Sequence, residues 1–108
     1  MSTSPVQFDN VSVVCKANIY FDGRVVSHTV VFKDGVKKTI GLIYAGSFTF
    51  NTGVAEKMEI ISGECKVKVK GETAWKEYAA GTIFCVPANS AFDITVEKGI
   101  AEYVCSYL

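Results

Sequence analysis

Leucine is almost absent from this chain of 108 residues, occurring only as Leu42 and Leu108, and its scarcity argues against a helical fold. Valine, isoleucine and threonine instead supply 31 of the 108 residues. These β-branched residues lose side-chain freedom in helices and pack well on the pleated surface of a sheet. The composition therefore predicts an all-β protein, and the short length leaves room for one hydrophobic core and one domain, residues 1–108.

The chain also lacks a net charge, a long apolar segment and a secretion signal. Lys and Arg together number 11, as do Asp and Glu, so no net field favours nucleic acid or a membrane surface. No stretch approaches the ~20 apolar residues of a membrane span, and the polar N-terminus has no apolar signal core. We expect a soluble cytoplasmic protein that binds neither nucleic acid nor membranes, with residues 1–10 as a flexible arm.

The four cysteines lack the short C-x-x-C spacing of most structural metal sites. They lie inside or beside apolar runs, at Cys15, Cys65, Cys85 and Cys105. Two disulfides or a cysteine metal site are the alternatives, but the spacing supports neither of them. We therefore expect four buried free thiols.

Turn-forming dipeptides divide the chain into short segments rich in β-branched and aromatic residues. The dipeptides are Asp22-Gly23, Asp34-Gly35, Ser62-Gly63, Lys70-Gly71, Ala80-Gly81 and Lys98-Gly99. Strands are expected over residues 19–21, 25–33, 38–44, 47–52, 57–62, 65–70, 75–78, 82–86, 92–96 and 101–107. Many short strands joined by hairpin turns predict a sandwich or a barrel.

One expected strand alternates perfectly between lysine and apolar residues. Lys66, Lys68 and Lys70 share one face, and the apolar residues between them share the other. A cationic stripe of this kind attracts a phosphate or an RNA backbone. We favour the interpretation that these lysines form a solvated outer face, or that they protect an edge strand against aggregation.

Two segments resemble the paired motifs of the cupin β-barrel, a jelly-roll fold. They are Phe50-Asn51-Thr52-Gly53-Val54-Ala55-Glu56 with Gly63 after it, and Gly81 followed by Pro87, Asn89 and Phe92. Cupins place metal-binding histidines where this chain has Phe50, Thr52 and Phe92. Of the family's ligands only Glu56 is left, and a catalytic metal needs about three protein ligands. We therefore expect a single-domain, cupin-like jelly-roll barrel without a metal.

A more specific resemblance covers most of the chain from residue 18 onward. The segments NIYFDG (18–23), FNT (50–52), EKMEIISG (56–63), WKEY (75–78), GTIFCVPANSAF (81–92) and YVCSYL (103–108) resemble the small cupin-type pyrimidine/purine nucleoside phosphorylases. The resemblance implies a glycosyltransferase, specifically a pentosyltransferase of broad specificity. Such an enzyme converts nucleosides and phosphate to free base and pentose 1-phosphate, with inorganic phosphate as co-substrate and no cofactor.

Glu56 is the first candidate for a catalytic residue, because a carboxylate facing the barrel interior needs a partner that offsets its burial. It would bind the ribose diol or stabilise positive charge on the sugar, and a structural ion pair with lysine is the alternative. Phe50, Phe84 and Phe92 would offer flat surfaces to a nucleobase, unless they simply pack as a core. The other expected substrate-binding residues are Thr52 and Met58.

The phosphate and the leaving base need further groups. Arg24 is the only arginine, so no other residue could clamp the phosphate through a bidentate guanidinium contact. The candidate phosphate ligands are Arg24, Lys38, Thr39 and Ser90, each of which is otherwise a surface or turn residue. His28, the only histidine, could protonate the leaving base, although a packed or exposed role is the alternative. Ser27 and Thr29 take the opposite face of its strand.

Two other functions compete with phosphorolysis. A metal-free cupin that binds or senses a small metabolite would be stabilised by its ligand without turnover, whereas the missing histidines argue against a metal-dependent dioxygenase or isomerase. Neither G-x-S-x-G nor a P-loop is present, which fits direct displacement by phosphate and a non-enzyme equally. In either case we expect a homodimer, because a small barrel leaves sheet edges to cover.

Overall fold

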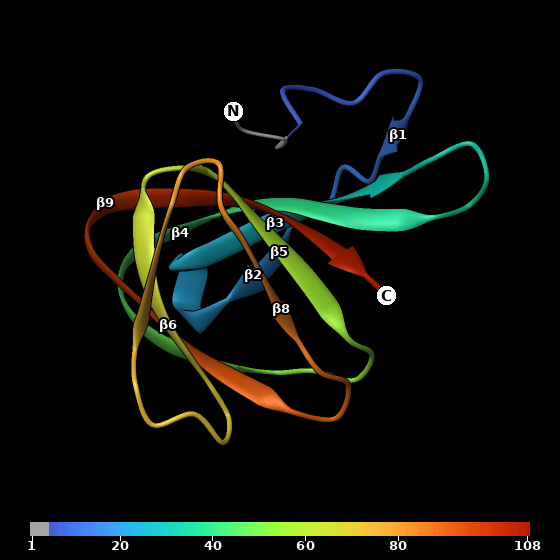
Figure 1. The fold of residues 1–108 in the computed structure, drawn as a ribbon. Helices are drawn as coiled ribbons and strands as arrows, with labels where there is room; N and C mark the ends of the chain where they lie inside the picture. The colour runs from blue at the N-terminus through green and yellow to red at the C-terminus, as the bar shows by residue number, and fades with distance from the viewer. Residues whose placement is uncertain (1–4) are drawn as a thin grey trace.

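The computed structural model describes residues 5–108, and nearly all their regular structure is antiparallel strand (Figure 1). A 3-10 turn, η1 (Phe21–Gly23), follows the second strand. The strands are β1 (Ser12–Val13), β2 (Asn18–Tyr20), β3 (Val25–Val31), β4 (Lys37–Asn51), β5 (Glu56–Ser62), β6 (Glu64–Val69), β7 (Lys76–Ala79), β8 (Ile83–Val86) and β9 (Ala91–Tyr107). The predicted all-β fold is confirmed.

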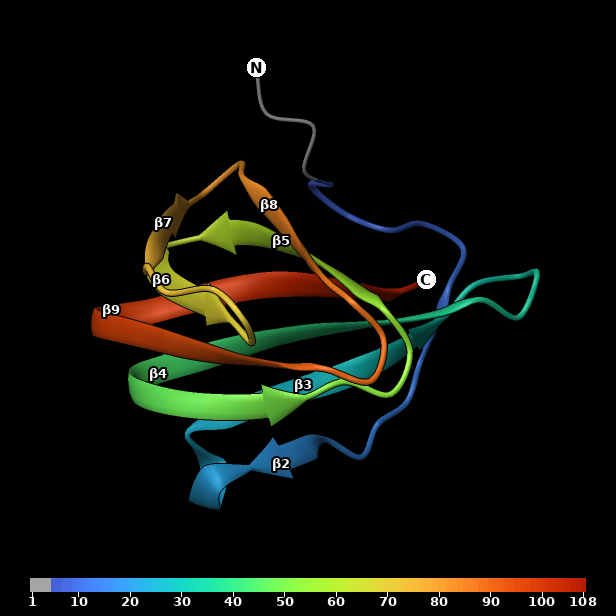
Figure 2. The same cartoon turned by 60° about the horizontal axis from the view of Figure 1, so that its bottom comes forward.

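The strands form two layers that enclose one interior (Figures 1 and 2). The large layer contains β1, β2, β3, residues 37–44 of β4, residues 100–107 of β9, β5 and β8. The small layer contains residues 46–51 of β4, residues 91–96 of β9, β6 and β7. The strands β4 and β9 therefore run through both layers and pair with each other in each.

Some expected strands and hairpins are wrong at the corners of the barrel. Residues 38–44 and 47–52 form one strand, as do residues 92–96 and 101–107. Hairpins occur at Asp22-Gly23, Asp34-Gly35 and Lys70-Gly71 as expected, but β5 does not pair with β6 and β7 does not pair with β8. Glycines at these corners adopt positive φ, 77° at Gly63 and 70° at Gly99, and bend the chain from one layer into the other.

The interior is filled by the inward faces of both layers. The largest fully buried side chains are Ile43, Ile60, Ile94, Val25, Val30, Val67, Val86 and Val96. Cys65 and Cys105 are buried as predicted, but Cys15 and Cys85 are exposed, and all four thiols are free. Cys85 is exposed because it lies on the outer face of β8, between two inward-facing residues. Its apolar neighbours in sequence are thus no guide to its own burial.

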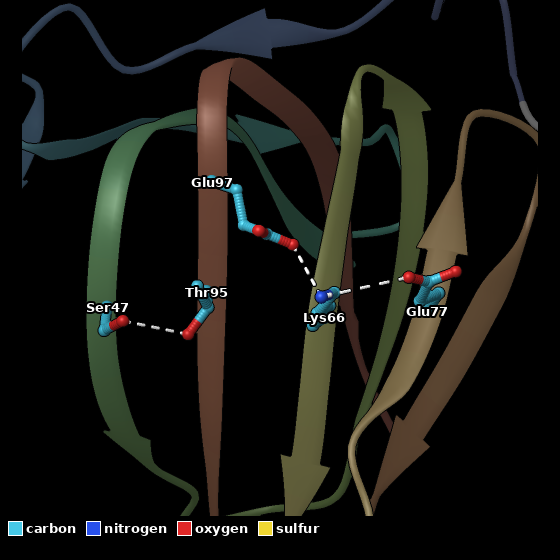
Figure 3. Close-up of polar contacts among 5 residues, drawn as sticks. All are labelled: Ser47, Lys66, Glu77, Thr95 and Glu97. Atoms are coloured by element: carbon cyan, nitrogen blue, oxygen red, sulfur yellow. Dashed lines mark hydrogen bonds and ion pairs between the residues drawn. The ribbon is translucent and has the colours of Figure 1, made fainter.

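Polar contacts cover the outer face of the small layer, where the lysine stripe lies as predicted. Lys66 Nζ is 2.7 Å from Glu97 Oε1 and 4.0 Å from Glu77 Oε1 (Figure 3). Ser47 Oγ lies 2.9 Å from Thr95 Oγ1 on the neighbouring strands. Within this stripe Lys66 is paired with two carboxylates, which favours the solvated outer face over a nucleic-acid surface.

The N-terminal segment lies against the large layer. Residues 5–10 form no strand or helix, and the Phe8 ring contacts Phe32 edge-on at a centroid distance of 5.1 Å. Residues 1–4 of the expected arm lie outside the described residues, and its flexibility stays a prediction. Within residues 5–108, no helix has the length and apolar character that crossing a membrane requires.

The corner at Gly63 provides a test of the bend between layers. A Cβ at this position would collide with the Ile100 carbonyl oxygen, whereas a Cβ at Gly71 would meet open space, and both residues have positive φ. We expect Gly71→Ala to lower the free energy of unfolding by about 1 kcal/mol through backbone strain alone. Gly63→Ala should cost clearly more in urea denaturation, and equal losses would contradict the proposed corner contact.

Candidate active site

A cavity of about 150 Å³ lies between the two layers. Its lining comes from both layers and from β2, and consists of Tyr20, Ser27, Thr39, Ile43, Phe50, Asn51, Glu56, Met58, Phe92, Tyr103, Cys105 and Tyr107. A larger hollow of about 590 Å³ lies around Lys66, Glu77 and Glu97. Those charged side chains already pair with one another, so the cavity between the layers is the better candidate for a ligand site.

The large layer supplies a polar wall, because register aligns its inward-facing residues across neighbouring strands. Ser27 on β3 pairs with Gly41 on β4, which in turn pairs with Tyr103 on β9. In the next inward row, Thr39 pairs with Cys105. Hydroxyl and thiol groups from three strands therefore meet on one surface.

A carboxyl and a thiol share one end of this wall. Cys105 Sγ donates a hydrogen bond to Glu56 Oε1 at 3.5 Å. Burial raises the pKa of Glu56, and the Cys105 hydrogen bond partly opposes this rise. Burial and the nearby Glu56 carboxylate raise the pKa of Cys105 to about 12. The thiol is thus protonated near neutral pH, where it acts as a hydrogen-bond donor and not as a nucleophile.

Two tyrosine hydroxyls complete the polar wall. Tyr107 Oη lies 3.4 Å from Thr39 Oγ1, and burial raises the pKa of Tyr107. Burial also raises the pKa of Tyr103, which a hydrogen bond with Ser27 partly lowers. Gly41 makes room for this arrangement, since a Cβ there would lie 2.8 Å from Tyr103 Oη. Both phenols therefore present neutral hydroxyls near neutral pH.

The opposite wall is aromatic: Phe50 and Phe92 come from the small layer, and Tyr20 comes from β2, beside β3 in the large layer. Phe50 on β4 stacks on Phe92 on β9, with ring centroids 5.6 Å apart and an interplanar angle of 22°. Tyr20 meets Phe50 edge-on at 5.9 Å. The cavity thus has one apolar, flat wall and one wall of hydrogen-bonding groups.

The segment after β2 holds Tyr20 at the cavity through a strained backbone. Phe21 and Asp22 have positive φ values of 52° and 56°, which are costly for residues with a side chain. The Phe21 ring contacts Phe48 and Phe50 at centroid distances of 5.0 and 5.4 Å, and these contacts offset the strain. The hairpin expected at Asp22-Gly23 is confirmed, because β2 and β3 pair antiparallel on either side of η1, which contains this dipeptide.

Five of the residues predicted from the sequence line the cavity together. These are Thr39, Phe50, Glu56, Met58 and Phe92. Strand alternation groups residues on one face of a strand, and the cupin resemblance predicted that Phe50, Glu56, Met58 and Phe92 point inward. The roles assigned to them stay predictions.

Three predicted residues are buried or half-buried elsewhere. Phe84 is part of the core and contacts Tyr78 and Phe92 at centroid distances of 4.9 and 5.7 Å. Thr52 Oγ1 donates to the Pro87 carbonyl at 2.7 Å and accepts from the Ser90 amide at 2.9 Å. Thr52 and Ser90 therefore close the connection between β8 and β9, and neither lines the cavity.

The remaining predicted residues lie outside the cavity. Lys38 points outward, with Nζ 5.5 and 5.6 Å from the ring centroids of Phe8 and Phe32. His28 also faces outward, and its Nδ1 lies 3.2 Å from the Val14 carbonyl oxygen. Arg24 is exposed beside η1. The cavity lining thus contains no lysine, arginine or histidine.

The residues of the cavity do not fit the histidine-based metal centre expected from the cupin motif. Phe50 and Phe92 have no donor atom, and the Thr52 hydroxyl is already bonded to the backbone. Among residues 5–108, no three His, Cys, Asp or Glu side chains gather where they could hold an ion. Glu56 and Cys105 are two potential donors, which is too few for a transition metal.

Several lining residues escaped the sequence analysis. They are Tyr20, Ile43, Asn51, Tyr103, Cys105 and Tyr107, together with Ser27, whose face of β3 was left open. Alternation along the C-terminal strand puts Tyr103, Cys105 and Tyr107 on one face, and this signal could have identified them. Tyr20 had no comparable signal, because its position depends on the strained turn that follows it.

Comparison with solved structures confirms the predicted fold. The cupin domain of Cnp3 from Schizosaccharomyces pombe superposes with a TM-score of 0.63 at 12% identity, covering 84% of this chain and 64% of that chain. This likeness concerns the fold alone. A protein of unknown function from Acinetobacter sp. ADP1 superposes with a TM-score of 0.92 at 48% identity, covering 94% of this chain and 98% of that chain.

Sequence comparison identifies the family. A family model described as pyrimidine/purine nucleoside phosphorylase matches residues 15–107. A protein of that name from Cupriavidus taiwanensis is 57% identical over 101 residues, which cover 94% of this chain and 95% of the relative. The chain therefore belongs to the pyrimidine/purine nucleoside phosphorylase family.

Proposed function

We propose that this protein is a metal-independent nucleoside phosphorylase that accepts both purine and pyrimidine nucleosides. A phosphate oxygen attacks C1′ of the pentose, and the C1′–N bond breaks with its electron pair leaving on the base. The base takes up a proton, and the other product is pentose 1-phosphate. The observation that carries the proposal is a cavity with an aromatic wall opposite a polar wall, in a chain of this family.

The aromatic wall supports binding of the nucleobase. Phe50 and Phe92 present nearly parallel rings, and Tyr20 stands at their edge. Stacking accepts any base, because every base has a π face, and it therefore suits broad specificity. Phe84, buried behind Phe92, would hold that ring in position.

The polar wall supports binding of the pentose. We assign the sugar diol to Glu56, whose carboxylate accepts two hydrogen bonds and stabilises positive charge as the base departs. The Cys105 thiol orients this carboxylate by donating to Oε1. The Thr39, Tyr103 and Tyr107 hydroxyls add neutral donors, so the wall binds polar groups without a cofactor.

We also propose that the enzyme is a cytoplasmic homodimer. The free thiols suit a reducing compartment. Tyr44 on β4 pairs with Ile100 on β9, and these side chains are 43% and 42% exposed on the outer face of the large layer. Ile40, on the same face of β4, is 41% exposed. A second copy would cover this apolar strip by an isologous contact.

Base release from a nucleoside panel tests the reaction. We expect uridine, inosine, adenosine and guanosine to release free base with phosphate and not without it, at a rate that a chelator leaves unchanged. Chromatography of the bases and the pentose 1-phosphate is the measurement. Hydrolysis without phosphate, or inhibition by the chelator, would contradict the proposal, and stabilisation by nucleosides without turnover would favour a binding module.

The pH dependence tests the role of Glu56. Burial raises its pKa, so activity that needs the carboxylate should fall as the pH drops through a value above the usual glutamate range. Cys105→Ala removes a hydrogen bond that lowers this pKa, so the acidic limb of kcat/KM should move to higher pH, whereas Cys105→Ser should move it less.

Substitution of the carboxylate itself sharpens this test. Glu56→Gln should lower kcat/KM by about 100-fold, the scale of one lost charge-stabilising group. Glu102→Gln, on the exposed outer face of β9, is the control and should retain activity. A Glu56→Gln protein that folds normally and works at the wild-type rate would remove Glu56 from the site.

Sedimentation velocity tests the homodimer. The wild-type protein should sediment as a dimer, and Tyr44→Lys with Ile100→Lys should shift it toward the monomer by placing charges on the apolar strip. Val54→Lys is the control, because Val54 is 52% exposed in the connection after β4. A monomeric wild type, or a dimer unaffected by the double substitution, would contradict the proposed surface.

A further inference from the structure

The cavity lacks the positive charge that phosphate needs. Its lining contains the Glu56 carboxyl but no lysine or arginine. A phosphate dianion beside a carboxylate is repelled unless a cation or several donors balance it. The basic residues Arg24 and Lys38 and the imidazole of His28 all lie outside the cavity.

The cavity is also too small to hold the whole reacting assembly. Its volume of about 150 Å³ is below the ~300 Å³ at the small end of ligand pockets. Base, pentose and phosphate therefore cannot all lie inside it. One of them must extend into the mouth of the barrel, where exposed side chains become available.

The alternation of residues along β4 places Lys37 at the mouth of the barrel. Inward-facing and outward-facing residues alternate along this part of β4. The buried, inward-facing residues are Thr39, Gly41 and Ile43, and the outward-facing residues include Ile40 and Tyr44. Lys37 stands two residues before Thr39, so it leaves β4 on the inward face. The phosphate candidate identified from the sequence, Lys38, takes the other face.

The same register brings Lys37 close to the polar wall. Lys38 pairs with Ser106 across β4 and β9, and Tyr107 pairs with Glu56 across β9 and β5. Lys37 is thus one residue beyond the last β4–β9 pair, on the side of Tyr107. Figures 1 and 2 show the β3–β4 hairpin and the end of β9 on the same side of the barrel.

The Lys37 ammonium is available for a ligand. Lys37 is exposed, and it forms no ion pair with another residue in the described part of the chain. Its long flexible stem can carry the charge over Thr39. Lys38, by contrast, lies over the rings of Phe8 and Phe32.

We propose that Lys37 binds the attacking phosphate at the barrel mouth, together with the Thr39 and Tyr107 hydroxyls. Lys37 Nζ and the two hydroxyls donate to phosphate oxygens, while Glu56 holds the sugar beside them. This inference rests on the proposed phosphorolysis. It also defines the geometry of attack on C1′, because the phosphate then lies at the polar wall and the base lies at the aromatic wall opposite. The nucleophile and the leaving group then approach C1′ from opposite sides, as displacement requires.

Two measurements on the full chain test the proposal. Titration calorimetry with inorganic phosphate reports binding without turnover, and steady-state kinetics with uridine reports KM for phosphate and for nucleoside. The variants are Lys37→Gln, the conservative Lys37→Arg, and the control Lys38→Gln. We expect Lys37→Gln to weaken phosphate binding and raise KM for phosphate by about 10-fold or more, the scale of a lost charge-assisted hydrogen bond.

The pattern across variants distinguishes binding from a general structural effect. Lys37→Gln should leave KM for uridine nearly unchanged, Lys37→Arg should restore most of the phosphate affinity, and Lys38→Gln should bind phosphate as the wild type does. An unchanged phosphate affinity in Lys37→Gln, or an equal loss in Lys38→Gln, would overturn the proposal. Wild-type protein that binds no phosphate at millimolar concentration would overturn it as well.

The same experiment separates this inference from the proposed function. If the wild type binds phosphate through Lys37 but releases no base from any nucleoside, the phosphorylase assignment fails and the phosphate site stands. If base release depends on phosphate but Lys37→Gln has the wild-type KM for phosphate, the phosphorylase assignment stands and the Lys37 site fails.

Discussion

The antiparallel pairing of β4 with β9 is the constraint on which the rest of the structure depends. Both strands bend and continue from one layer into the other, so their inward residues build both walls of the cavity. Thr39 and Phe50 come from β4, and Cys105 and Phe92 come from β9. Backbone hydrogen bonds fix the register of the two strands, and the register fixes which polar group faces which aromatic ring.

The polar wall is built mainly from neutral groups around one carboxyl. Burial raises the pKa values of Glu56, Cys105 and both tyrosines, so the thiol and the phenols stay protonated and serve as donors. Such a surface suits the proposed binding of a neutral, hydroxyl-rich sugar, because it avoids the cost of burying several charges. Lys37, the proposed cation for phosphate, lies at the solvated rim, where it needs no permanent partner.

Much of the fold and part of the site could be predicted because strand periodicity is local. Alternation placed Glu56 and Met58 on one face, and the cupin resemblance correctly predicted that this face, Phe50 and Phe92 point inward. The same rule fails where a strand bends or a turn is strained, so the continuity of β4 and β9 and the position of Tyr20 were missed. The phosphate candidates Lys38, Ser90 and Arg24 rest on residue type and on a position at a strand start or a turn, and neither signal decides on which face a side chain lies.

The sequence by itself determined the all-β class, the loss of the cupin histidines and the family, since these depend on composition and on residues in fixed order. The tertiary structure decided which residues meet in the cavity. Glu56 and Cys105 are 49 residues apart in the chain, and Thr39 and Tyr107 are 68 residues apart. Their contacts arise only when distant strands align in one register, a long-range consequence of chain folding that no local pattern in the sequence contains.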